Sequence, residues 1–177
     1  YASQGVASVC KAENLLKTPT GTSACKPSGS KTVYNKGAPV QISSVEQVAF
    51  GKDKIGFQIK VKNVGGGKVF ASSDLSCTDK SAEDNNKVTV NDKVILKSVN
   101  LGGTGLDLSK CGPLGTYTVA NVDQKTIPLI NGEGTILCRE DLTAGRRGNV
   151  EDLLTIDLGY NYDSQTPPKT FTVRIAE

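Results

Sequence analysis

The sequence predicts an all-β fold, an antiparallel β-sandwich, and three observations support this prediction. Short apolar runs recur along the chain after residue 37, and nearly all are flanked by Gly, Pro, Asn or Asp. Several runs alternate apolar and polar residues, which is the pattern of a strand that buries one face. No alternation of strand and helix patterns indicates βαβ units. About eight or nine short strands are therefore expected to form two packed layers.

The first 37 residues are predicted to be an N-terminal extension, with the sandwich in residues 38–177. Most of this leader is polar, and the stretches 18–23 and 26–30 have the composition of turns and loops. A weak helical pattern predicts one or two turns of helix, and extended structure laid against a neighbouring segment is the alternative. The residues of this pattern are Val6, Val9, Cys10 and Leu15.

A β-hairpin is predicted between Pro39 and Phe70, where two alternating runs flank the turn-forming residues 51–54. The second run ends in Asn-Val-Gly-Gly-Gly at 63–67, which predicts a relaxed corner, because glycine adopts positive φ angles without steric cost. The side chains expected on the buried face are Val40, Ile42, Ile55, Phe57, Ile59 and Val61. The opposite face is expected to carry Gln41, Gln58, Lys60 and Lys62.

Two later segments also read as hairpins. Asn131-Gly132 separates two apolar runs, and this dipeptide tolerates the positive φ angles of a tight hairpin turn. A strand predicted at 153–162 turns at 163–168 and returns at 169–175. Tyr160 and Tyr162 share one face of the first of these strands, and packing explains their spacing more simply than an exposed binding platform does.

The five cysteines are predicted to form two disulfides. They include no Cys-x-x-Cys pair, and without histidine the usual zinc sites cannot be assembled. Cys10 and Cys25 bracket a short, turn-rich stretch with little apolar content, so they are paired first. Cys111 is paired with Cys138, which leaves Cys77 free. Reduced, buried cysteines are the alternative. Disulfides would indicate an oxidising compartment or a thermophilic source.

Composition argues against several classes of function. The net charge of +3 is spread along the chain and gives no nucleic-acid footprint. Without histidine the Ser-His-Asp and Cys-His catalytic arrangements cannot be built, so the chain is predicted not to be an enzyme and to hold no cofactor or metal. No apolar run approaches the roughly 18 residues that span a bilayer. A start at Tyr1 without methionine fits a cleaved secretion signal, and a trimmed or incomplete chain explains it equally well.

Two charged stretches are candidate binding sites. The acidic stretch 74–85 could offer oxygen ligands to calcium, but its spacing matches no EF-hand, so a solvated loop is favoured. Arg146 and Arg147 could grip an anionic glycan or a carboxylate of a neighbouring subunit. An arginine pair alone is weak support for such a site.

One motif resembles a known family. Residues 38–42 (Ala-Pro-Val-Gln-Ile) and 55–67 (Ile-Gly-Phe-Gln-Ile-Lys-Val-Lys-Asn-Val-Gly-Gly-Gly) are similar to the immunoglobulin-like domains of archaeal cell-surface proteins. Such domains recur in surface-layer and adhesion-type chains. The resemblance extends to the 153–175 hairpin and covers roughly residues 38–177. It implies an immunoglobulin-like sandwich with an extracellular or cell-surface location.

These observations lead to the expectation of a non-enzymatic extracellular structural protein that assembles with copies of itself into a surface layer or a pilus- or thread-like filament. The leader could donate a strand to the next subunit, through residues 1–9 or 32–34, or it could pack on its own domain. The predicted assembly residues are Tyr1, Ala2, Val6 and Val9. An adhesin or a carbohydrate- or protein-binding module is the alternative function.

Overall fold

The computed structural model describes residues 1–12, 14–16, 25–71, 91–119, 122–142 and 150–164. Within these ranges the regular elements are β-strands and one 3₁₀ helix, η2 (Leu108–Lys110). The strands are β1 (Ala2–Lys11), β2 (Gly29–Lys31), β3 (Val33–Asn35), β4 (Val40–Ala49), β5 (Lys54–Asn63), β6 (Lys68–Phe70), β7 (Lys93–Leu101), β8 (Thr104–Gly105), β9 (Cys111–Gly112), β10 (Gly115–Val119), β11 (Val122–Pro128), β12 (Glu133–Asp141), β13 (Val150–Gly159) and β14 (Asn161–Asp163). The predicted all-β class is confirmed.

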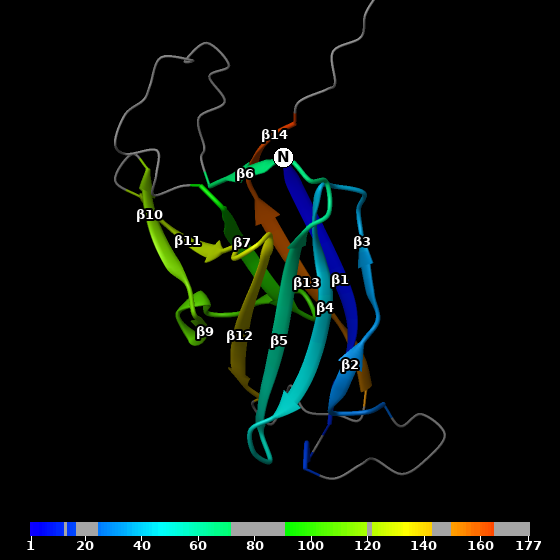
Figure 1. Ribbon diagram of the computed structural model, residues 1–177. Helices are drawn as coiled ribbons and strands as arrows, with labels where there is room; N and C mark the ends of the chain where they lie inside the picture. The colour runs from blue at the N-terminus through cyan, green and yellow to red at the C-terminus, as the bar shows by residue number, and fades with distance from the viewer. Residues whose placement is uncertain (13, 17–24, 72–90, 120–121, 143–149, 165–177) are drawn as a thin grey trace, which may run out of the picture.

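Two antiparallel sheets form the body of the molecule (Figure 1). Sheet A has the order β10-β11-β7-β13-β1-β3, with β8 attached to β7, and sheet B has the order β2-β4-β5-β12-β9. Buried side chains from both sheets belong to one hydrophobic cluster, so the sheets pack face to face. Strands β6 and β14 pair separately at the end of the body that is uppermost in Figure 1.

The N-terminal strand lies inside sheet A. Residues Ala2 to Lys11 pair with β13 over its whole length, and β3 pairs with the other side of β1 at Gly5–Ala7. The predicted helical turns are therefore wrong for residues 2–11, and the extended alternative is confirmed. The helical pattern misled because Val6 and Val9 point to opposite faces of this strand. The described part of the leader packs on its own domain, with β1 between β13 and β3.

The predicted alternation in the first hairpin is confirmed. Strands β4 and β5 pair around the turn at 51–54. The hydrogen bond that closes this turn runs from Phe50 N to Lys54 O at 2.8 Å. All the side chains expected on the buried face are at most 1% exposed: Val40, Ile42, Ile55, Phe57, Ile59 and Val61. Asn131 and Gly132 have φ angles of +53° and +79°, as expected for the second hairpin turn. The predicted return strand at 169–175 lies outside the described residues.

Two closely spaced strands connect the sheets. Residues 29–31 pair with β4 in sheet B, and residues 33–35 pair with β1 in sheet A, so the chain changes sheets at Thr32. The Asn35 side chain accepts a hydrogen bond from Ile42 N and donates one to Ile42 O, both at 2.9 Å. The edges of the two sheets are thereby joined beside the switch.

Both predicted disulfides are present. Cys10 is bonded to Cys25, and Cys111 to Cys138. The first ties the end of β1 to the segment before β2, and the second ties the two-residue strand β9 to β12. Cys77 lies outside the described residues. The two bonds indicate an oxidising, extracellular-type environment.

Candidate interaction surfaces

The four predicted assembly residues do not share one surface. Val9 is 1% exposed and belongs to the core, whereas Ala2 is exposed at the start of β1. Val6 is half-buried on the outer face of sheet A. Tyr1 is 63% exposed, and its ring stacks on Tyr160 with a centroid distance of 5.9 Å.

Tyr160 and Tyr162 serve packing rather than an exposed platform. Tyr160 is 2% exposed, and its hydroxyl accepts a hydrogen bond from Val40 N at 3.1 Å. Burial of this ring raises the pKa of the Tyr160 hydroxyl, and the hydrogen bond from Val40 opposes that shift less strongly. The half-buried Tyr162 accepts a hydrogen bond from Gly67 N at 2.6 Å. Tyr160 therefore ties the end of β13 to the start of β4, and Tyr162 ties β14 to the glycine-rich corner.

Exposed apolar side chains cross three neighbouring strands on the outer face of sheet A. Tyr34 on β3 is opposite Val6 on β1, and Leu153 on β13 is opposite Ser8, two residues further along β1. Leu153 is thus a diagonal neighbour of Val6. Tyr34 is 70% exposed and Leu153 is 56% exposed. We call Tyr34, Val6 and Leu153 the outer stripe.

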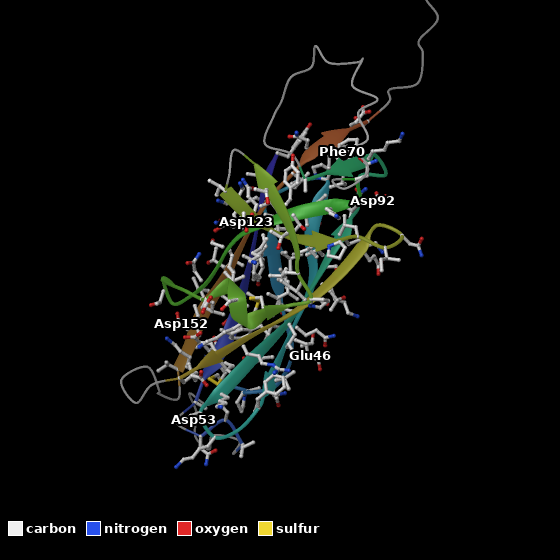
Figure 2. All side chains as sticks on the ribbon, turned by 90° about the vertical axis from the view of Figure 1, so that its left-hand side faces the viewer. Glu46, Asp53, Phe70, Asp92, Asp123 and Asp152 are labelled. Atoms are coloured by element: carbon white, nitrogen blue, oxygen red, sulfur yellow. A yellow bond between two sulfur atoms is a disulfide. The ribbon has the colours of Figure 1, made fainter. Side chains whose placement is uncertain are left out.

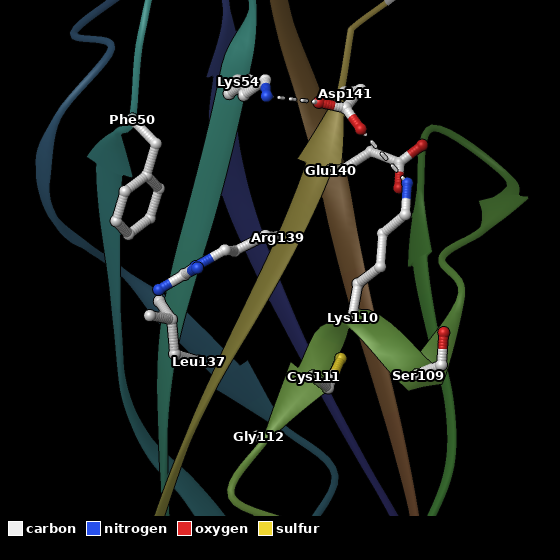
Figure 3. A pocket seen from close by; sticks show the side chains of 10 residues that line it. All are labelled: Phe50, Lys54, Ser109, Lys110, Cys111, Gly112, Leu137, Arg139, Glu140 and Asp141. Carbon is white, nitrogen blue, oxygen red and sulfur yellow. Dashed lines mark hydrogen bonds and ion pairs between the residues drawn. The ribbon is translucent and has the colours of Figure 1, made fainter.

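A groove of about 740 Å³ lies at the β9 edge of sheet B (Figure 3). Strand β9 pairs with β12 only at Leu137 and Cys138, so the groove opens beside the C-terminal part of β12. We call it the sheet B groove. It is lined by Phe50, Lys54, Ser109, Lys110, Cys111, Gly112, Leu137, Arg139, Glu140 and Asp141.

Phe50 and Arg139, two residues that line the sheet B groove, pack together over Gly56. A Cβ atom placed on Gly56 would lie 2.2 Å from the Phe50 ring, so the ring occupies the space that a side chain at position 56 would need. Arg139 is opposite Gly56 in the β5–β12 register. Its guanidinium lies over the Phe50 ring, with the Cζ atom 4.7 Å from the ring centroid.

Three further charged residues of the groove form two ion pairs. The Asp141 carboxylate forms an ion pair with Lys110 at 3.3 Å and a longer one with Lys54 at 3.9 Å (Figure 3). Two ammonium groups thus share one carboxylate. Among the described residues, Arg139 forms no ion pair, and its contact is with Phe50. A planar guanidinium held in this way can receive a carboxylate through two parallel hydrogen bonds.

The sheet B groove continues into an apolar hollow of about 380 Å³. The two share Phe50, Gly112 and Leu137. The further lining residues of the hollow are Val48, Gln58, Pro113, Thr135 and Ile136. A ligand that spans both parts would therefore meet cations at one end and aliphatic side chains at the other.

The described acidic residues do not gather into a metal site. No group of three or more metal-ligating side chains occurs in the described ranges. Figure 2 shows the labelled acidic residues spread over the molecule: Glu46, Asp53, Asp92, Asp123 and Asp152. The proposed calcium ligands at 74–85 and the pair Arg146-Arg147 both lie outside the described residues.

Sequence reasoning missed the outer stripe and the sheet B groove. Gly56 within an alternating strand was the one available indication, because an isolated strand glycine often marks close approach of another group. Comparison with protein families, with curated proteins and with solved structures finds no match. Across the part of the chain that the structure describes, no helix combines the length and apolar character needed to cross a membrane.

Proposed function

We propose that this chain is a non-enzymatic structural protein of the cell surface that assembles with copies of itself through the outer stripe. The observation that carries the proposal is the exposure of Tyr34 and Leu153 on either side of Val6, on a regular sheet face. Exposed apolar residues that lie together commonly mark interaction sites. Burying one such side chain contributes about 1.5–3 kcal/mol.

A flat sheet face is suited to pairing with an identical face. In a twofold contact each copy presents the same patch, so the stripe of one subunit would cover the stripe of its partner and close a dimer. A second contact would join such dimers into a layer or filament. The disulfides support the extracellular part of the proposal, because such bonds persist in oxidising surroundings. We also propose that the sandwich is immunoglobulin-like and that the assembly is a layer or a filament.

Sedimentation velocity of the full chain over a range of concentrations tests self-assembly. The unaltered protein should form dimers as its concentration rises, and ordered polymers in negative-stain images would show that a second contact joins these dimers. The double substitution Tyr34→Ser, Leu153→Ser should keep the protein monomeric. Val122→Ser is the matched control, because Val122 is 60% exposed and lies on β11, near the other edge of sheet A.

Two results would contradict the proposal. The unaltered protein could stay monomeric at every concentration, or the double variant could assemble as well as Val122→Ser does. Circular dichroism of each variant checks that the fold is intact. A binding module is the second candidate function, and the charged and apolar parts of the sheet B groove favour it.

A further inference from the structure

We propose that the sheet B groove binds a carboxylate side chain on an acidic, extended polypeptide segment of a partner. Arg139 is the residue that would receive this carboxylate. The proposal is independent of the outer stripe, which lies on the outer face of the other sheet.

The first step of the argument is the fixed position of the guanidinium. Arg139 extends across β5 onto Phe50, and Phe50 can lie there because position 56 has no side chain. Stacking on the ring engages the face of the guanidinium and leaves its N–H groups at the edge. A guanidinium held in one place loses less conformational entropy when a carboxylate binds.

The second step is the balance of charge. The groove is lined by the cations Lys54, Lys110 and Arg139 and by the carboxylates Glu140 and Asp141. Asp141 accompanies both lysines. The balance therefore favours one additional negative charge, and Arg139 is the cation that forms no ion pair among the described residues.

The third step concerns the class of ligand. The adjoining hollow offers Val48 and Pro113 to an aliphatic side chain, so an acidic residue flanked by apolar residues fits both parts. A sugar commonly stacks on an exposed aromatic ring face. The Phe50 ring already contacts Gly56 and the Arg139 guanidinium, which favours a polypeptide over an anionic glycan.

Titration with two synthetic peptides tests the proposal. The probe is acetyl-Leu-Asp-Leu-Glu-Leu-amide, and its control replaces Asp and Glu by Asn and Gln. Isothermal titration calorimetry at low salt should detect binding of the acidic peptide only, and added salt should weaken this binding. Polygalacturonate in a parallel titration represents an anionic glycan.

Variants of the full chain locate the site. Arg139→Gln should lower the affinity for the acidic peptide roughly ten- to a hundredfold, as expected for hydrogen bonds between charged groups. Arg139→Lys should also weaken binding, because an ammonium lacks the planar pair of donors. Lys60→Gln is the matched control, since it removes one exposed positive charge from the same sheet and should leave the affinity unchanged.

Three outcomes would overturn the proposal. They are equal binding by Arg139→Gln and the unaltered protein, equal binding of the neutral peptide, and preference for polygalacturonate. Thermal unfolding of each variant separates lost binding from lost folding. The double variant Tyr34→Ser, Leu153→Ser should bind the peptide normally, and Arg139→Gln should self-assemble normally, so failure of one proposal is distinguishable from failure of the other.

Discussion

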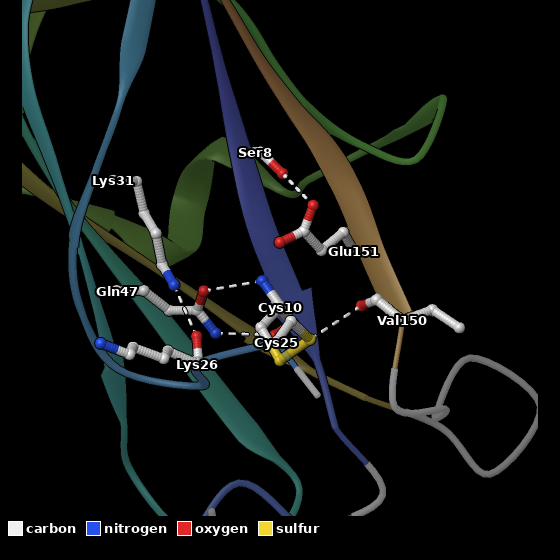
Figure 4. The surroundings of a disulfide bond; sticks show 8 residues. All are labelled: Ser8, Cys10, Cys25, Lys26, Lys31, Gln47, Val150 and Glu151. Atoms are coloured by element: carbon white, nitrogen blue, oxygen red, sulfur yellow. Dashed lines mark hydrogen bonds between the residues drawn. A yellow bond between two sulfur atoms is a disulfide. The ribbon is translucent and has the colours of Figure 1, made fainter. Parts of the chain in front are cut away.

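The side chain of Gln47 makes both backbone hydrogen bonds of Cys10 (Figure 4). Cys10 N donates to Gln47 Oε1 at 2.9 Å, and Gln47 Nε2 donates to Cys10 O at 2.7 Å. Cys10 is on β1 of sheet A and Gln47 is on β4 of sheet B. The Gln47 carboxamide thus makes the two hydrogen bonds to Cys10 that a neighbouring strand would otherwise make, and it links the two sheets. Gln47 is fully buried, and its amide meets the backbone beside the Cys10–Cys25 disulfide.

Replacing Gln47 by leucine should destabilise the fold. Gln47→Leu places an apolar side chain in the core but leaves Cys10 N and O without their partner. A buried polar group that loses its hydrogen bond costs about 1–3 kcal/mol, so the free energy of unfolding should fall by about 2–5 kcal/mol. Urea denaturation followed by circular dichroism measures this change.

The matched control for this variant is Gln58→Leu. Gln58 is half-buried on the outward face of β5 and should tolerate the change within about 0.5 kcal/mol. A similar small effect for Gln47→Leu would show that the carboxamide is dispensable.

The local strand patterns could be predicted from the sequence, because alternation and turn residues act over a few positions. The burial of Gln47 could not. A bulge between Ile42 and Ser44 shifts the register of β4, so Val45 and Gln47 point inward while Val48 points outward. The apolar run 38–50 gives no position for such a shift.

The place of β1 and the groove were also beyond sequence reasoning. The pairing of Ala2 with Gly159 joins segments at opposite ends of the chain, and no local pattern encodes such a contact. The stacking of Arg139 on Phe50 depends on the register of β12 against β5. The disulfides could be inferred because few pairings suited the loop lengths and because no metal arrangement competed.

Mapping of the cysteines should find two disulfides and one thiol. Alkylation of the denatured, unreduced chain should label Cys77 alone, because Cys10–Cys25 and Cys111–Cys138 occupy the other four. Mass spectrometry of the peptides identifies the labelled residue. Label on any other cysteine, or none at Cys77, would contradict this assignment.

Removal of either disulfide should lower the free energy of unfolding by a similar amount. The closed loops span 15 and 27 residues, and the chain-entropy account gives about 3 kcal/mol for the shorter and slightly more for the longer. Paired Cys→Ser substitutions followed by urea denaturation measure both. Cys77→Ser is the control, and a loss of stability in this variant equal to that in the paired variants would contradict the prediction.

Tyr160 should make the fold sensitive to alkali. Burial raises its pKa above the ordinary value of 10.0, so the unfolded chain releases this proton at a lower pH than the folded chain does. Its contribution to stability is complete below about pH 10 and is lost as the pH rises through the folded pKa. Ultraviolet titration should show a late tyrosine ionisation that belongs to Tyr160.

The variant Tyr160→Phe identifies the residue responsible. It should remove the late step from the titration, and it should destabilise the protein by about 1–3 kcal/mol because Val40 N loses its acceptor. Persistence of the late step in this variant would assign it to another tyrosine.

The slot between β13 and β3 provides a test of strand donation. A chain without residues 1–9 should lose its cooperative thermal transition, because β13 and β3 lose the strand between them. Adding a peptide of residues 1–9 should restore the transition if the slot accepts a strand from another molecule. A truncated chain that unfolds cooperatively without the peptide would mean that β1 is not required.

The control peptide carries Gly5→Val. Gly5 is buried in β1, and a Cβ atom there would lie 2.4 Å from Cγ1 of Ile42, which is itself packed in the core. The valine peptide has the same length and charge and a higher strand propensity, yet it should not restore the fold, because Ile42 blocks its entry. Equal rescue by both peptides would show that the added strand binds elsewhere. Rescue by the glycine peptide alone would establish that a strand supplied by another molecule fills the position of β1, which is the property that assembly by strand donation requires.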